Sequence, residues 1–519
     1  MTMQKTLSLA LLAMFAGAAL ATPDEALVNA GRAIYRDGVL PTGAPLEAKR
    51  AGSDAVQGSA AACANCHQRS GLGLSEGAVV TPPVSAPVLF EKAVATPAGR
   101  RAPGVEFRDY TFRTRPAYDD ATLARAIREG VNPSGEALKD LMPRYALADA
   151  DMKALVAYLH TLSAQPSLGV VGNRVQVATV ITPDASPQQR DEYLGVLRAC
   201  AADHPEWHLH EWTLQGPTAT WPAQLRERNT REPVFAVLSG VGGIDWAPVQ
   251  RFCEAQSVPC LFPNVIVPGS RIPGWYTFYF FRGVELEATV FMSEIKRRHA
   301  ERPVPRVMQV IGKGAASRGG SLVLDSLYDA GIQLEEDEKD VSKLGEDDVL
   351  ILWQSPEELA ALMKRVPTPP KGTLVLVSGL LAGLEDAPLN AAWKAVAQMS
   401  YPYDAAARWK LRMDRNLKPW LAQHHLDAGD MRLQGNTLAA CNVFSESLLR
   451  MNGKFMRDYL VETIENYPTA MGNAPAPEAF PRFSLGPGQR FSSKGAYLVR
   501  FVSPQDKRVA PVRDEWIVP

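Results

Sequence analysis

The sequence predicts a multidomain protein in which a small helical domain is followed by a larger α/β domain with two lobes. The chain has 519 residues, which is too many for a single hydrophobic core. Residues 147–162 place apolar side chains at helical spacing behind an Asp-rich first turn, whereas short β-rich runs alternate with helical stretches after residue 172. Residues 166–172, rich in Pro, Gly and small side chains, indicate a linker between the two domains.

Composition and charge indicate which classes of protein the chain can belong to. The apolar fraction of 46% and the charged fraction of 21% are ordinary for globular domains. The net charge of −1 gives no long-range field, so neither nucleic acid nor an anionic membrane is indicated as a partner.

The N-terminal residues predict export. Lys5 precedes an apolar run of about 14 residues, which ends in the small-residue pattern Ala19-Leu20-Ala21. A membrane anchor is the alternative, but a span needs roughly 20 apolar residues. We therefore expect a signal peptide over residues 1–21, cleaved near Ala21, a periplasmic location, and no transmembrane segment after processing.

Residues 63–67 carry the most specific motif in the chain, Cys63-Ala-Asn-Cys66-His67. In C-x-x-C-H both thiols can form thioethers with one porphyrin, and the histidine that follows becomes an axial ligand of the iron. A redox dithiol and a zinc site are the alternatives. Residues 68–141 contain no Cys or His, so a second pair of zinc ligands is absent from that stretch. We expect one covalent haem c at Cys63 and Cys66, with His67 on the iron.

The sixth iron ligand can be sought by elimination. Between the signal peptide and residue 165 the candidates are Met142, Met152 and His160. Met152 and His160 fall within the predicted helix 147–162, whereas Met142 precedes Pro143 in a loop that can lay a thioether over the haem. Met142 is the predicted axial ligand, and packing in the core is the alternative.

Four features occur in one order: Gly31-Arg-Ala-Ile-Tyr35, C-x-x-C-H, Met142-Pro-x-Tyr145, and the helix that ends near residue 162. Residues 22–165 resemble the class I cytochrome c family from end to end. The resemblance implies an all-α domain, electron transfer, His67/Met142 ligation, and packing of Gly31 and Tyr35 against Tyr158 and Leu159. It also implies that the carbonyl of Pro82 or Pro83 orients the His67 ring.

The second domain is predicted to contain parallel sheets with helices on both faces, because β-rich runs alternate with helical stretches. A helix over 284–298 separates two series of such runs and therefore indicates two lobes. The expected strands are 175–181, 208–213, 234–238, 259–262 and 276–281, then 306–311, 332–335, 349–353 and 373–378.

Residues 173–519 resemble the type I periplasmic binding proteins of the branched-chain amino-acid kind, which serve ABC transporters. The resemblance rests on the order of several segments: 234–243, 258–263, 279–283, 313–320, 486–490, 495–499 and 514–516. It implies a small-molecule site between the lobes, formed by loops 182–186, 239–243, 263–265, 316–319 and 401–404. The candidate ligand residues are Ser239, Gly240, Gly243, Ser317, Arg318 and Asp404. Tight turns are the alternative role for the glycines.

The remaining cysteines, Cys200, Cys253, Cys260 and Cys441, can pair in an oxidising compartment or stay as buried thiols. The sequence shows no catalytic triad or paired-acid signature, so no enzymatic activity is assigned. We expect a periplasmic electron carrier with a redox partner protein and an unknown small-molecule ligand. The alternatives are a cytochrome subunit of a periplasmic dehydrogenase and a solute receptor of an ABC importer with an accessory haem domain.

Overall fold

The computed structural model divides the chain into two compact units, Met1–Gln165 and Pro166–Pro519. The predicted signal peptide lies outside the described residues. The structure describes residues 24–518 except 51, 53, 77–78, 95–113, 244, 267–273, 299, 301–305, 315–319, 324–333, 336–340, 467–478 and 482.

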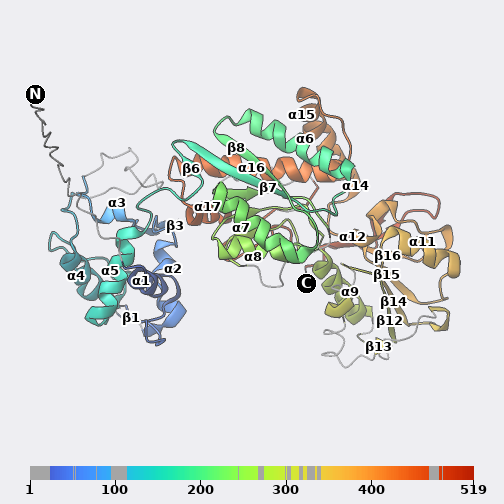
Figure 1. The fold of residues 1–519 in the computed structure, drawn as a ribbon. Coiled ribbons are helices and arrows are strands. Elements are labelled where there is room, and N and C mark those ends of the chain that lie inside the picture. Colours follow the sequence, from blue (N-terminus) through green and yellow to red (C-terminus); the bar gives the residue numbers. More distant parts are fainter. Residues whose placement is uncertain are drawn as a thin grey trace, which may run out of the picture. The chain divides into compact units, whose positions relative to one another are not determined.

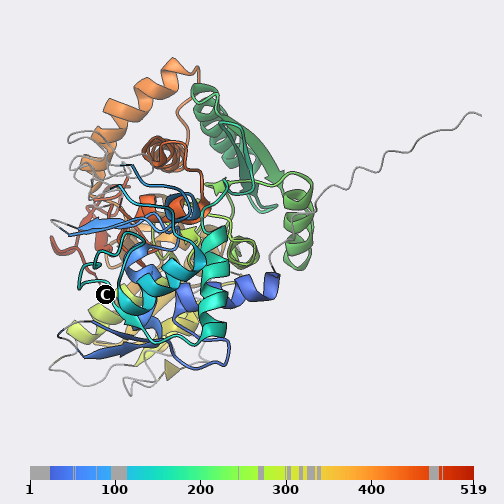
Figure 2. The same cartoon turned by 90° about the vertical axis from the view of Figure 1, so that its left-hand side faces the viewer.

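The first unit is organised around two crossing helices, α1 and α5 (Figure 1; Figure 2). Gly31 of α1 lies so close to α5 that a Cβ atom there would come within 2.0 Å of the Ala154 carbonyl oxygen. The ring of Tyr35 packs on Tyr158 at 5.4 Å between centroids, so the predicted contact of the first helix with Tyr158 is confirmed. The helices of this unit are α1 (Glu25–Asp37), α2 (Ala64–His67), α3 (Ala86–Leu89), α4 (Asp120–Glu129) and α5 (Asp149–Thr161), with the 3-10 turn η1 (Gly58–Ala61).

The expectation of an all-α first domain is not confirmed, because short strands pair in the segments between the helices. These strands form an antiparallel sheet in the order β2-β1-β5 and a separate hairpin of β3 and β4. Long connections must satisfy their backbone N–H and C=O groups, and local pairing does so without a helix. The strands are β1 (Glu47–Lys49), β2 (Ala55–Gln57), β3 (Leu74–Glu76), β4 (Val79–Thr81) and β5 (Arg144–Tyr145).

The first lobe of the second unit contains a sheet in the order β11-β10-β9-β7-β6, with β8 also paired to β7. The pairs β7–β8, β7–β9, β9–β10 and β10–β11 are parallel, as the alternating pattern predicted. Its strands are β6 (Val170–Val171), β7 (Arg174–Ile181), β8 (Trp207–Thr213), β9 (Ala236–Leu238), β10 (Cys260–Leu261) and β11 (Thr277–Phe278).

The second lobe contains a sheet in the order β13-β12-β14-β15-β16-β17-β18. Its first five strands run parallel, whereas β17 and β18 are antiparallel additions at one edge. The sequence did not predict β16, since Gln398-Met-Ser-Tyr401 lacks β-branched residues and an alternating pattern. The strands are β12 (Val307–Ile311), β13 (Leu334–Glu335), β14 (Val349–Trp353), β15 (Leu374–Val377), β16 (Gln398–Tyr401), β17 (Tyr497–Phe501) and β18 (Val509–Pro511).

Helices cover both sheets of the second unit. The long helix α16 packs on α6 and reaches β9, so it belongs to the first lobe although it lies in sequence between β16 and β17 of the second lobe (Figure 1). Helix α9 has the bounds that the sequence predicted. The helices are α6 (Pro187–Asp203), α7 (Trp221–Arg231), α8 (Ala247–Ala255), α9 (Val284–Arg298), α11 (Pro356–Arg365), α12 (Gly379–Ala382), α13 (Ala391–Lys394), α14 (Ala406–Arg412), α15 (Lys418–Gln423), α16 (Met431–Met451) and α17 (Arg457–Glu465). Short 3-10 turns include η2 (Thr218–Thr220), η3 (Val341–Lys343) and η4 (Leu384–Asp386), and a π-helical segment η5 (Met413–Leu417) joins α14 to α15.

Two disulfides stabilise the second unit. Cys200 of α6 is bonded to Cys441 of α16, and Cys253 of α8 is bonded to Cys260 of β10. Among the residues that the structure describes, no helix is both long and apolar enough to cross a bilayer.

Candidate functional site

The C-x-x-C-H motif forms one short helical turn in the first unit. The carbonyl oxygen of Cys63 accepts hydrogen bonds from the backbone N–H of Cys66 at 3.2 Å and of His67 at 3.0 Å. The side chains of Cys63, Cys66 and His67 therefore project from a single turn of the chain.

Cys63 and Cys66 are both free thiols, whereas the other four cysteines are paired in disulfides. Burial raises the pKa of the Cys63 thiol to about 12. A redox-active dithiol needs a cysteine whose pKa is lowered, so that the thiolate is present at neutral pH. The environment of Cys63 therefore disfavours thioredoxin-like chemistry.

The imidazole of His67 is buried, with 7% of the residue exposed, and its Nδ1 lies 2.9 Å from the carbonyl oxygen of Pro82. Of Pro82 and Pro83, the structure therefore selects Pro82 as the residue that orients the ring. Burial lowers the pKa of His67, and the bond to Pro82 only partly opposes this effect. A neutral ring that donates from Nδ1 keeps the Nε2 lone pair for a metal.

Hydrogen bonds fix the chain on both sides of the motif. The hydroxyl of Tyr145 donates to the Ala61 carbonyl at 3.1 Å, and the hydroxyl of Tyr35 donates to the Gln68 carbonyl at 2.8 Å. The carbonyl of His67 accepts from the N–H of Gly73 at 3.1 Å. The motif is thus held between the first helix and the segment that contains Met142.

Met142 lies in the loop between α4 and α5, as predicted. Its half-buried side chain packs against the same hydrophobic cluster as Cys63. The backbone of the loop is held by Arg144, whose guanidinium donates to the Met142 carbonyl and, at 3.4 Å, to that of Leu138.

The other two candidates for the sixth ligand are used elsewhere. Met152 is a core residue of α5, with 4% of its surface exposed. His160 pairs with Asp120 at 2.8 Å and stacks on Phe90 at 3.7 Å between ring centroids. The elimination made from the sequence therefore agrees with the positions of these side chains.

The donor set fits haem, since two unoxidised thiols and an imidazole with a free Nε2 share one turn, and a methionine packs on the same core. The family model for cytochrome c matches residues 53–163. These residues are a cytochrome c domain. Haem is accordingly the cofactor that this domain implies.

In the second unit, three of the five loops predicted to bind a ligand meet at the carboxyl ends of parallel strands, whereas loop 316–319 lies outside the described residues. The N–H of Thr182 donates to the Val241 carbonyl at 3.1 Å, and the N–H of Asn264 donates to the Gly240 carbonyl at 2.8 Å. Loops 182–186, 239–243 and 263–265 therefore lie side by side.

Polar groups in these loops are bonded to one another. The Ser239 hydroxyl donates to the Phe262 carbonyl at 3.2 Å and accepts from Asn264 Nδ2 at 3.3 Å. Gly240 has φ +147°, and a Cβ atom there would lie 2.5 Å from the ring of Trp246. The buried Ser239 and Gly240 thus build the loop itself.

Gly243 has the same kind of internal role. Its N–H donates to Asp184 Oδ2 at 2.6 Å, and Asp184 Oδ1 accepts from the Thr182 hydroxyl. Asp184 is a first-lobe carboxylate that the sequence reasoning passed over, although it lies in a loop that was singled out.

Asp404 is buried and fully engaged. Its carboxylate pairs with Arg408 at 2.8 Å and with Arg412 at 2.8 Å, and it accepts from the Ala405 N–H. It is therefore not poised for the ammonium group of a ligand. Ser317 and Arg318, the two remaining candidates, lie outside the described residues.

The fold of the second unit is similar to that of several solved structures. A branched-chain amino acid ABC transporter protein from Thermus thermophilus with bound valine has 12% identity and a TM-score of 0.49, covering 67% of this chain and 97% of that one. A leucine binding protein from Thermotoga maritima has 11% identity and a TM-score of 0.48, covering 66% and 99%. A branched-chain amino acid transporter substrate binding protein from Streptococcus pneumoniae with isoleucine has 12% identity and a TM-score of 0.47, covering 67% and 100%. No match was found among curated proteins.

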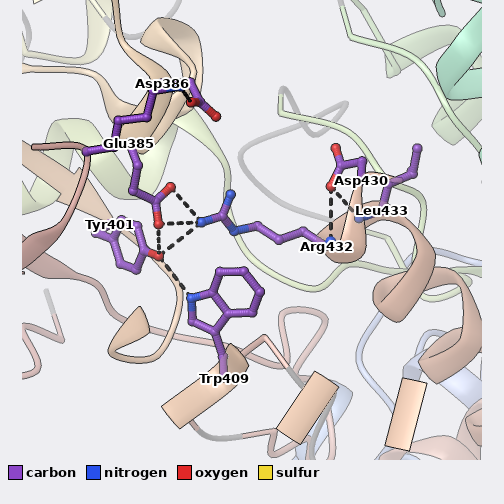
Figure 3. A network of polar contacts seen from close by, with 8 residues as sticks. Glu385, Asp386, Tyr401, Trp409, Asp430, Arg432 and Leu433 are labelled. Carbon is purple, nitrogen blue, oxygen red and sulfur yellow. Dashed lines mark hydrogen bonds and ion pairs between the residues drawn. The ribbon is translucent and has the colours of Figure 1, made fainter. Parts of the chain in front are cut away.

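Sequence reasoning missed the polar network that joins the two lobes, in which Arg432 of α16 meets Glu385 of η4 and Tyr401 of β16 (Figure 3). Tyr401 opens the predicted ligand loop 401–404, but Arg432 and Glu385 come from two other segments and belong to no recognisable motif. The signal that could have found them is weak: Arg432 and Asn436 are polar residues one turn apart at the start of a mostly apolar helix.

Proposed function

We propose that the protein is an exported mono-haem c-type cytochrome that transfers electrons, and that its second unit binds a small molecule which localises or gates this transfer. The observation that carries the proposal is the His67 ring, buried beside two free thiols and oriented by Pro82 at 2.9 Å. This arrangement supports thioethers at Cys63 and Cys66 and iron ligation by His67 Nε2.

Different residues of the cytochrome domain would orient the His67 ring and supply the sixth iron ligand. Pro82 holds the Nδ1 proton of His67, which fixes the tautomer and the plane of the ring. Met142 would supply the sixth ligand, since its loop packs on the core that contains Cys63. Haem supplies one-electron chemistry when bound, and a thioether ligand favours its ferrous state over the ferric one. These features favour an electron carrier over a gas-binding protein.

The periplasm is the proposed location. The N-terminal pattern that ends at Ala21 supports export, and the two disulfides of the second unit are consistent with an oxidising compartment. A redox partner in the same compartment would exchange electrons with the cytochrome domain.

Electrochemical titration of the purified, exported protein tests the proposal. We expect one haem per chain and a single one-electron wave. Met142→His should keep the haem and lower the midpoint potential by on the order of 100 mV, a fraction of the roughly 0.8 V over which axial ligands set haem potentials. The buried Met152 provides the matched control, since Met152→Leu should leave the potential unchanged. A protein without a redox-active chromophore contradicts the proposal.

A further inference from the structure

Arg432 connects the two lobes of the second unit through an ion pair with Glu385. Its Nη2 atom lies 2.6 Å from both carboxylate oxygens of Glu385 and 3.1 Å from the hydroxyl of Tyr401 (Figure 3). Arg432 lies in the first turn of α16, which packs on the first lobe, whereas Glu385 and Tyr401 belong to the second lobe. The pair therefore lies where a ligand held between the lobes would be.

The guanidinium of Arg432 is only partly used by this contact. An arginine fork binds a carboxylate best through two parallel N–H···O bonds from two nitrogens. Here one nitrogen serves both oxygens of Glu385, and the buried Nε atom has no hydrogen-bond partner among the described residues. A second carboxylate could make the two-nitrogen contact that Glu385 does not make.

Aromatic rings surround the same guanidinium. Its central carbon lies 4.7 Å from the ring centroid of Trp409, 5.0 Å from that of Tyr403 and 5.8 Å from that of Tyr401. Rings at these distances stabilise a cation and also offer apolar surface to the body of a ligand. Trp409 Nε1 donates to the Tyr401 hydroxyl at 3.1 Å, which fixes both rings.

Asn436 supplies a second unused polar atom on the same helix. It lies one helical turn after Arg432, on the same face of α16. The residue is 95% buried, since its exposed fraction is 5%, and its Oδ1 has no hydrogen-bond partner in the described part of the chain. The adjacent Thr437 lies on a neighbouring face of α16, where its hydroxyl accepts from Asn264 Nδ2 at 3.2 Å, so α16 packs against a loop at the end of β10.

We propose that Arg432 is the receptor for the carboxylate of a small hydroxy acid, that Glu385 holds this position when no ligand is bound, and that Asn436 accepts a hydrogen bond from the hydroxyl group of the ligand. The proposal rests on the small-molecule role given above to the second unit and names the chemical class of the ligand. Ligand binding exchanges one carboxylate for another on Arg432, so it releases Glu385 and with it the ion pair between the lobes.

A hydroxyl group suits this place better than an ammonium group. An ammonium needs a carboxylate partner when it is buried. Asp404 is held by Arg408 and Arg412, and Asp184 is held by Thr182 and Gly243. Glu385 occupies the guanidinium of Arg432, at the carboxylate end of the ligand, whereas the unused acceptor one turn along α16 is the neutral amide oxygen of Asn436, which a hydroxyl satisfies without a charge.

Calorimetric titration of the full-length holoprotein tests the proposal, with lactate, 2-hydroxyisovalerate and mandelate as probes. The primary amide and the amino acid that correspond to each probe provide the comparison. We expect the hydroxy acids to bind, and the neutral amides to bind about 100-fold more weakly, because they cannot pair with Arg432. Equal affinity for acid and amide, or tighter binding of the amino acids than of the hydroxy acids, would overturn the proposal.

Three variants sharpen the test. Glu385→Gln should raise the affinity for the hydroxy acids about tenfold, because the internal competitor loses its charge. The double variant Arg432→Gln/Glu385→Gln leaves no unpaired charge in the protein and should bind at least about 100-fold more weakly than the single variant. The matched control is Asp386→Asn, since this neighbouring carboxylate points away from the network and pairs with Lys507 on the surface (Figure 3); it should leave affinity unchanged.

The outcomes separate this inference from the proposed function. A protein with a full haem spectrum that binds none of the probes, or a double variant whose affinity stays within about twofold of that of Glu385→Gln, refutes the role of Arg432 and leaves the cytochrome intact. A colourless protein that still binds the hydroxy acids supports Arg432 and refutes the haem proposal.

Discussion

The two units of this chain place their chemically active groups in different ways. In the cytochrome domain, Cys63, Cys66 and His67 lie on one helical turn and are close in sequence as well as in space. In the second unit, Arg432, Glu385 and Tyr401 come from separate segments and meet only when the two lobes are assembled. The chemistry of a compact motif can therefore be predicted from the sequence. The chemistry of a site assembled from distant segments can be recognised only once the fold is known.

Replacing the two thiols should have the largest effect and should be confined to the first unit. In the Cys63→Ala/Cys66→Ala variant we expect the loss of essentially all covalent haem, because no thioether can form. Haem staining after denaturing electrophoresis measures this directly. The matched control is Cys253→Ala/Cys260→Ala, which removes a disulfide and should retain full haem. Equal haem loss in both variants would contradict the claim that haem is attached at Cys63 and Cys66 and not at the disulfide cysteines.

Removing the long-range disulfide should have the next largest effect and should be confined to the second unit. Cys200 and Cys441 are 241 positions apart, so their bond restricts the unfolded chain far more than the bond between Cys253 and Cys260, which are 7 apart. Loop-closure entropy gives about 5 kcal/mol for the first bond and about 2 kcal/mol for the second. Denaturant unfolding of Cys200→Ala/Cys441→Ala and Cys253→Ala/Cys260→Ala, followed by tryptophan fluorescence, tests this order.

Glu287 should make the free energy of unfolding of the second unit depend on pH. Burial raises the pKa of this carboxyl to about 8, against hydrogen bonds from Ser378 and Leu380 that lower it. A raised folded-state pKa means that the folded state holds the proton more tightly, so its stabilising effect is complete below pH 4.5 and is lost as the pH rises to about 8.

The Glu287→Gln variant tests this assignment. It should match the wild type near pH 5 and exceed its free energy of unfolding by a few kcal/mol near pH 9. Urea unfolding at several pH values measures the difference, and Glu357→Gln, an exposed residue at the start of α11, is the control. Parallel pH profiles of Glu287→Gln and the wild type would refute the role of Glu287.

A single methyl group at the helix crossing should have the smallest of these effects. In the Gly31→Ala variant the new Cβ would meet the Ala154 carbonyl, so α1 and α5 must separate slightly. Overpacking of this kind costs about 1–3 kcal/mol. Thermal unfolding followed by the haem absorbance should show the loss, whereas Lys153→Ala, at an exposed position of α5, serves as the control for an alanine substitution in the same unit. The second unit should unfold as in the wild type.

Much of the fold could be predicted because many helices and strands are specified by residues within the element itself. The parallel strand β14 is a continuous apolar run, β7 is rich in β-branched residues, and α9 carries acidic residues in its first turn and basic residues in its last. The pairing of Cys253 with Cys260 was one of the alternatives left open, because both flank one helix-to-strand turn. The pairing of Cys200 with Cys441 depends on the contact of α6 with α16, which nothing near either residue reveals.

The haem site was easier to predict from the sequence than the ligand site, because its residues also form a local motif. His67 and Met142 were predicted as iron ligands from a motif and from an elimination among three residues. The predicted roles of Ser239 and Asp404 took account of strand ends but not of neighbours such as Asn264 and Arg412, whose side chains take up their hydrogen bonds. Partners that arrive from distant segments decide whether a polar side chain is free for a ligand.

Peptide mass analysis of the purified, exported protein tests the central claim most directly. After reduction of the disulfides and proteolysis, the peptide that contains Cys63 to His67 should carry the mass of one haem, and every other cysteine peptide should have its unmodified mass. A motif peptide with two free or disulfide-bonded thiols and no added haem mass would contradict the account.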